Sequence, residues 1–173
     1  MSKYSLKKII KLLAMRLSDL LFKDQKVHRK NFKKKNVQLS SLISIKTGSC
    51  PEDCKYCPQS AHYNVDLKKE NLINLLSLEN AAIKAKKNGA QRFCMGAAWK
   101  KLRDGNDLET VIKMVKTVKS LGLEACVTLG TISESQAKKL KEAGLDAYNH
   151  NIDSSPNFYK KIIASRTFDE RLE

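Results

Sequence analysis

The stretch that decides the fold and chemistry of this 173-residue chain is Gly48-Ser49-Cys50-Pro51-Glu52-Asp53-Cys54-Lys55-Tyr56-Cys57-Pro58. Its three cysteines, spaced by three and then two residues on a short loop bounded by proline, can direct their sulfurs to one point, as the ligands of an iron-sulfur cluster must. A cubane cluster has four irons, so three thiolates leave one iron free to bind a small molecule. The loop is therefore predicted to be reactive rather than structural.

Strand and helix patterns alternate along the chain around this loop. Strands are predicted at residues 42–46, 91–95, 124–129 and 147–149, and helices begin near residues 77, 106, 133 and 156. This order is typical of a parallel α/β protein, whose sites lie at the carboxyl ends of the strands. A complete eightfold barrel needs about 250 residues. We therefore expect a partial TIM-type barrel of about the first four β/α units, over residues 41–173.

Residues 1–40 are predicted to form a separate cap. An apolar stripe from Leu6 to Leu21, with lysines around it, predicts one amphipathic helix, and the basic run at residues 23–35 predicts a solvated connection. No apolar run approaches the about 20 residues that a bilayer requires. Five cysteines without an export signal predict reduced thiols in the cytoplasm, and their odd number disfavours a disulfide framework.

The charge of the chain is strongly positive. Basic residues outnumber acidic ones by 33 to 18, which gives a formal charge of +15 that could attract nucleic acid. However, lysines occur in every predicted helix, and aromatic residues make up only 6% of the chain, so no stacking platform accompanies the charge. Nucleic-acid binding is therefore not favoured.

Alternation along the strands places two further cysteines on one face. Phe93 and Met95 form the apolar side of their strand, so Cys94 lies on the opposite side, and the same reasoning places Cys126 beside it on the next strand. We expect both thiols to face the barrel interior, although either alone could be a small core residue. By the same alternation Asn149, Asn151 and Asp153 would share a face, although they could instead cap the helix at Pro156.

The cysteine loop and its surroundings resemble the radical S-adenosylmethionine enzymes, and among them the biotin synthase family. The resemblance covers nearly the whole chain in the family's order. It rests on Ser44-Ile45-Lys46-Thr47-Gly48, the cysteine loop through Pro58-Gln59, Arg92-Phe93-Cys94-Met95-Gly96-Ala97-Ala98-Trp99, Gly122-Leu123-Glu124-Ala125-Cys126, and Tyr148-Asn149-His150-Asn151-Ile152-Asp153.

The resemblance implies two clusters. Cys50, Cys54 and Cys57 would hold a 4Fe-4S cluster that binds S-adenosylmethionine, while Cys94 and Cys126 would hold a 2Fe-2S cluster that supplies sulfur. In the family, an electron releases a 5′-deoxyadenosyl radical, which abstracts hydrogen from dethiobiotin, and sulfur insertion then gives biotin. The protein positions these parts and excludes water, and no residue is assigned as an acid or base.

Further residues and partners follow from the same resemblance. Tyr56 matches an aromatic residue near the adenine, and Asn151 and Asp153 match residues that bind the ribose, whose hydroxyls need donors and acceptors. The small residues Gly96-Ala97-Ala98 leave room for the methionine end of the cofactor. An electron donor such as flavodoxin or ferredoxin, and a homodimer, are also implied.

The chain departs from the family in its length. Family members supply a further cysteine and an arginine to the second cluster from beyond the matching region, and neither has a counterpart here. We therefore expect the isolated chain to bind the first cluster but to make no biotin. The alternatives are a zinc site with His62 as fourth ligand, a zinc- or cluster-bearing basic module that binds nucleic acid, and a non-functional remnant.

Overall fold

The structure is a computed structural model that describes residues 4–32 and 37–173. Its contacts divide the chain into two compact units, Met1–Val37 and Gln38–Glu173. The first unit contains helices α1 (Leu6–Leu13) and α2 (Leu17–Asn31), and every described side chain in it is at least partly exposed. The prediction of one continuous helix is wrong, because Arg16 has an extended backbone (ψ of 143°) that interrupts the helical hydrogen bonds.

The predicted connection at residues 23–35 is also wrong as far as Asn31. Lysine, arginine and glutamine favour a helix, and the cations Arg29 and Lys30 lie in the last turn of α2, where they complement the helix dipole. The rest of that prediction, residues 33–35, lies outside the described residues. Among the described helices, none is long and apolar enough to cross a bilayer.

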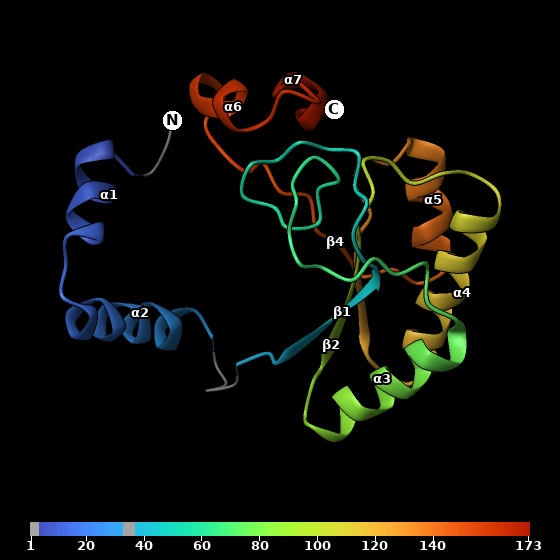
Figure 1. The fold of residues 1–173 in the computed structure, drawn as a ribbon. Helices are drawn as coiled ribbons and strands as arrows, with labels where there is room; N and C mark the ends of the chain where they lie inside the picture. Colours follow the sequence, from blue (N-terminus) through green and yellow to red (C-terminus); the bar gives the residue numbers. More distant parts are fainter. Residues whose placement is uncertain (1–3, 33–36) are drawn as a thin grey trace. The chain divides into compact units, whose positions relative to one another are not determined.

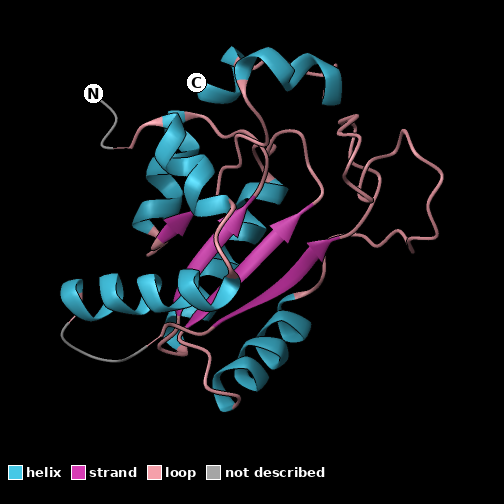
Figure 2. Cartoon of the chain, turned by 90° about the vertical axis from the view of Figure 1, so that its left-hand side faces the viewer, coloured by secondary structure: helices cyan, strands magenta, loops and turns pink. Residues whose placement is uncertain are grey.

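The second unit is built on four parallel strands in the order β1-β2-β3-β4, which confirms the predicted α/β architecture. The strands are β1 (Ser40–Lys46), β2 (Arg92–Ala97), β3 (Glu124–Thr128) and β4 (Ala147–Tyr148). All four point the same way, so their carboxyl ends meet at one edge (Figure 2). The register pairs Leu42 with Cys94, Cys94 with Cys126, and Cys126 with Ala147, which places these four residues in one row across the sheet.

Three helices cover one face of this sheet (Figure 1): α3 (Leu75–Lys87), α4 (Asn106–Ser120) and α5 (Glu134–Glu142). The core between them is apolar, and Ile45, Leu78, Val111, Val127 and Leu140 in it are fully buried. On α4, Met114 is fully buried, whereas Ile112 is only half-buried.

Helix capping explains where these helices begin. α5 begins near residue 133 as predicted, with a capping box in which the side chains of Ser133 and Gln136 bond each other's backbone N–H groups. The predicted cap of α3 at Ser77 is wrong: Asn74 is the cap, because its Oδ1 accepts the Ser77 N–H at 2.8 Å. The helix therefore begins one turn earlier than the apolar pattern indicates.

The segment after β4 returns over the carboxyl edge of the sheet. It forms α6 (Pro156–Ile162), with Pro156 in its first turn as predicted, and the short α7 (Asp169–Leu172) (Figure 1). Tyr159 and Ile163 from this segment are fully buried and pack against Cys54, which forms a second small core. This second core joins the cysteine loop to α6.

Candidate cofactor site

The cysteine loop begins directly after β1, at the carboxyl edge of the sheet. Gly48 and Ser49 have φ angles of 72° and 55°, so the chain turns sharply there. The loop then closes on itself: Cys50 N–H donates to the Gln59 carbonyl at 2.9 Å, and Ala61 N–H donates to the Cys50 carbonyl at 2.8 Å. The two ends of the loop, at Cys50 and at residues 59–61, are therefore held side by side.

The structure brings the three predicted ligands together around one cavity of about 260 Å³. Cys50 and Cys54 are buried, Cys57 is half-buried, and all three are free thiols. The small residues Gly96-Ala97-Ala98, at the end of β2, form part of the same wall, as the resemblance implied. Thiol donors beside a cavity with small walls suit an iron-sulfur cluster with a bound small molecule.

Burial raises the pKa of the Cys50 and Cys54 thiols. Metal ligation requires thiolates, so these protons must leave when the thiols bind iron. Among residues 4–32 and 37–173, no three His, Cys, Asp or Glu side chains are arranged to hold a single metal ion. A cubane makes no such demand, since each thiolate binds a different iron. The ring of His62, the fourth ligand of the zinc alternative, lies 3.1 Å from the Pro51 carbonyl oxygen.

A second cavity of about 400 Å³ continues along the same face of the sheet and shares Leu42 and Thr128 with the first. Cys94 and Cys126 both line it from directly opposed positions on β2 and β3, as the alternation predicts. Burial and the neighbouring Cys94 thiol raise the pKa of Cys126 to about 11. The Arg92 guanidinium forms an ion pair of 2.8 Å with the Glu124 carboxylate on the same face.

The predicted nucleoside ligands are only partly gathered. Burial and a hydrogen bond to Asp153 raise the pKa of the Tyr56 hydroxyl, so this pair lies together. Asn151 is exposed, and its carbonyl accepts the Arg171 Nε–H at 2.6 Å. The strand alternation used to group these residues does not hold, because β4 ends at Tyr148 and Asp153 has a φ of 70°. Asn149 instead donates to Thr128 at 3.2 Å.

A charged network beside the cysteines was not predicted. Arg166 forms ion pairs with Glu52 at 3.2 Å and with Asp153 at 2.9 Å, and the side chains of all three are at most 10% exposed. Glu52 Oε1 accepts no hydrogen bond from the described residues, and Lys100 Nζ lies 3.8 Å from it. Arg166 therefore connects the cysteine loop to the candidate ribose ligand.

A second set of contacts clamps the cysteine loop to residues 162–166. The Asp53 carboxylate accepts the N–H groups of Ala164 and Ser165 at 2.9 Å each. The Ser165 hydroxyl in turn donates to Glu52, and Lys55 N–H donates to the Ile162 carbonyl at 3.0 Å. Partial burial alone would raise the pKa of Asp53, but the hydrogen bonds that its carboxylate accepts, chiefly from Ser165 and Ala164, hold this pKa at about 2. We call these contacts the loop clamp. Its only signal in the sequence was two carboxylates inside the cysteine loop.

Comparison with known proteins identifies the class that this fold and site define. The profile of the Radical SAM superfamily matches residues 44–173, from β1 through the cysteine loop to the last residue. The chain therefore belongs to the Radical SAM superfamily. The structure is also similar to that of the FeFe-hydrogenase maturase HydG from Carboxydothermus hydrogenoformans, with a TM-score of 0.69 over 96% of this chain and 39% of that one. At 15% identity this likeness shows a shared fold.

The similar curated proteins indicate a narrower family within this superfamily. The chain is 54% identical to the biotin synthase of Hahella chejuensis over 170 residues, which is 98% of this chain and 48% of that protein. It is 57% identical to the biotin synthase of Cupriavidus pinatubonensis, over 94% of this chain and 47% of that protein. The biotin synthase of Buchnera aphidicola matches at 54% identity, over 98% of this chain and 49% of that protein. The chain thus spans about half the length of the curated relatives it matches.

Proposed function

We propose that this chain carries the cofactor-binding part of a biotin synthase-type radical enzyme, with Cys50, Cys54 and Cys57 as ligands of a 4Fe-4S cluster. The observation that supports this most is the position of three free thiols around one cavity at the carboxyl edge of a parallel sheet. When bound, such a cluster supplies an open iron for S-adenosylmethionine and the electron that cleaves it. In this proposal residues 1–40 form a cap and residues 41–173 the first half of a barrel domain.

The chain's own residues would bind and orient the nucleoside. Asp153 is held by Arg166 at 2.9 Å and is bonded by Tyr56, so its carboxylate is fixed beside an aromatic ring. A fixed carboxylate is suited to accept hydrogen bonds from ribose hydroxyls, and Asn151 would add an amide next to it. The buried ion pair of Glu52 and Arg166 lines the cavity beside the cysteines and would help to exclude water from it.

The second cavity supports the remainder of the proposal. Cys94 and Cys126 would provide two ligands of a 2Fe-2S cluster, with dethiobiotin as substrate on the same face of the sheet. Two thiols do not complete the ligand set of such a cluster, which supports the prediction that the isolated chain makes no biotin. We further propose a homodimer in the cytoplasm that accepts electrons from flavodoxin or ferredoxin.

Anaerobic reconstitution with iron and sulfide tests this function. We expect iron and acid-labile sulfide to be bound in equal amounts, and cleavage of S-adenosylmethionine to methionine and 5′-deoxyadenosine in the presence of dithionite. The variant Cys54→Ser should lose both, while Cys126→Ser should keep the first cluster. Zinc as the sole bound metal, or full loading of Cys54→Ser, would contradict the assignment. Complementation of a biotin auxotroph by this chain alone would overturn the expected lack of biotin synthesis.

A further inference from the structure

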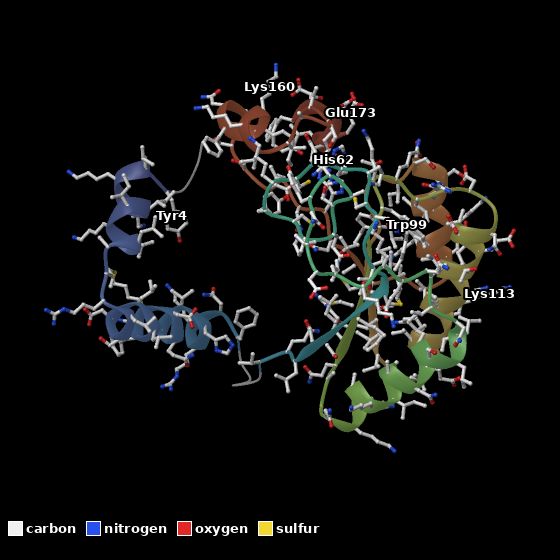
Figure 3. All side chains as sticks on the ribbon, in the orientation of Figure 1. Tyr4, His62, Trp99, Lys113, Lys160 and Glu173 are labelled. Carbon is white, nitrogen blue, oxygen red and sulfur yellow. The ribbon has the colours of Figure 1, made fainter. Side chains whose placement is uncertain are left out.

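The outer surface next to the cysteine loop is basic. Lys55 lies in the loop, and Lys160 and Lys161 lie on α6, whose opposite side packs on Cys54 through Tyr159. All three lysines are exposed, and Figure 3 shows Lys160 pointing outward from α6. Lys55 N–H bonds the Ile162 carbonyl at 3.0 Å, so the loop lysine lies next to the end of the helix that carries the other two.

The charges of this surface are not neutralised from within. Among the described residues, none of the three lysines takes part in an ion pair. The nearby carboxylates of Asp53 and Asp153 turn inward, to backbone N–H groups and to Arg166.

An exposed aromatic ring lies within the same surface. Phe158 is 48% exposed, and Lys161 Nζ lies 5.5 Å from its ring centroid. A large apolar side chain surrounded by like charges is typical of a surface that meets a partner of the opposite charge, because the charges steer the encounter and the ring provides buried area. We call the surface formed by Lys55, Phe158, Lys160 and Lys161 the lysine face.

We propose that the lysine face docks an acidic one-electron carrier protein, and that it does so because the cysteine loop lies directly beneath it. This inference rests on the proposed function, which requires an electron at the cysteines from outside the chain. The carrier gives up one electron and is oxidised by one equivalent, the cluster bound at the cysteines is reduced by one equivalent, and no atom is transferred. Opposite charges raise the rate of encounter and make it sensitive to salt.

The experiment uses FMN-loaded bacterial flavodoxin as the probe and measures its affinity for the metal-free chain. In the variant K55E/K160E/K161E we expect the dissociation constant at low salt to rise by at least about tenfold, since each reversal replaces an attraction by a repulsion. The control K87E/K113E/K116E makes the same change of charge on α3 and α4, where Lys113 lies on the helical face of the sheet (Figure 3). It should change the affinity by less than about threefold, as expected for distant, screened charges.

Equal loss of affinity in the two triple variants, or binding that does not weaken with added salt, would overturn the proposal. The milder pair K160Q/K161Q gives the same comparison should charge reversal lower the thermal stability. A labelled RNA that loses affinity for K55E/K160E/K161E, while flavodoxin does not, would assign the face to nucleic acid and also overturn it.

The reductant separates this inference from the proposed function. With reconstituted protein, dithionite should drive cleavage of S-adenosylmethionine equally in wild type and in K55E/K160E/K161E, whereas flavodoxin should drive it more slowly in the variant. No cleavage with either reductant contradicts the proposed function. Equal rates of flavodoxin-driven cleavage in wild type and in K55E/K160E/K161E contradict the docking proposal and leave the proposed function intact.

Discussion

Gly130 allows the loops after β2 and β3 to touch, and its replacement by alanine tests how closely the candidate site is packed. Gly130 has a φ of 80°, and a Cβ built on it would lie 2.3 Å from the Lys100 carbonyl oxygen and 2.5 Å from that of Trp99. Both contacts are with backbone atoms, which cannot rotate away. The loops are also joined by a hydrogen bond from Thr131 N–H to the Lys100 carbonyl at 2.9 Å.

Two costs add in Gly130→Ala. The left-handed backbone costs an alanine about 1–2 kcal/mol, and forcing the two loops apart costs about 1–3 kcal/mol by analogy with overpacked cores. We therefore expect the free energy of unfolding to fall by about 2–5 kcal/mol. Gly89→Ala is the matched control, since Gly89 has a φ of 87° but its added Cβ would meet only the flexible Leu39 side chain, at an ordinary contact distance of 3.8 Å. It should cost only the backbone part, about 1–2 kcal/mol.

Urea denaturation followed by circular dichroism measures the difference between the two variants. Trp99, the one tryptophan of the chain, provides a local signal because its own carbonyl is one of the contacts. Both substitutions reduce the flexibility of the unfolded chain in the same way, so this contribution cancels in the comparison. If both variants lose the same stability, the reasoning about the close approach of the two loops is refuted.

The remaining predictions concern the loop clamp, the core and the response to acid. Asp53→Asn should lower the free energy of unfolding by about 1–3 kcal/mol, as for hydrogen bonds to charged groups, and should lower the iron bound on reconstitution, whereas the exposed Asp66→Asn should do neither. Leu140→Ala, at a fully buried position, should cost about 2–5 kcal/mol in denaturant unfolding, and a cost below that range would mean that α5 packs loosely. Partial burial opposes the shift, but the ammonium of Lys119 at 2.7 Å and a backbone N–H lower the pKa of Asp146. The stability that this carboxylate contributes is therefore complete above about pH 4 and is lost as the pH falls through its folded pKa. The melting temperature of Asp146→Asn should therefore fall less than that of the wild type when the pH is lowered below about 4. An equal fall in the two proteins would contradict a lowered pKa of Asp146.

Local patterns made much of this fold predictable from the sequence. The strands were placed within about two residues, since alternating side chains and the glycines before β2, β3 and β4 act over short distances. The facing of Cys94 and Cys126 followed from the same period of two and was correct. The break at Arg16 was missed because the apolar stripe continues through it and no glycine or proline marks it.

The grouping of the three cysteines was predictable from the sequence, but the residues that support them were not. The cysteines stand close together in the chain, so their spacing alone indicated that they would line one cavity. Asp153 was grouped with Asn149 by extending β4 beyond Tyr148, and this failed because the backbone turns at a φ of 70°. Arg166 could not be connected to Glu52 by any local rule, since 114 residues separate them and only the folded chain brings them to 3.2 Å.

The cysteine loop has no regular secondary structure of its own between Ser49 and Cys57, so its shape has to come from elsewhere. The loop clamp provides it from residues 162–166, which lie beyond all four strands. Contacts over such a separation in sequence form late, because the entropy of closing the chain must first be offset by local structure. The sheet can therefore form before the thiols are in place. We infer that the carboxyl edge of the sheet positions the cysteine loop coarsely, and that Asp53, Ser165 and Arg166 set the final geometry of the three thiols.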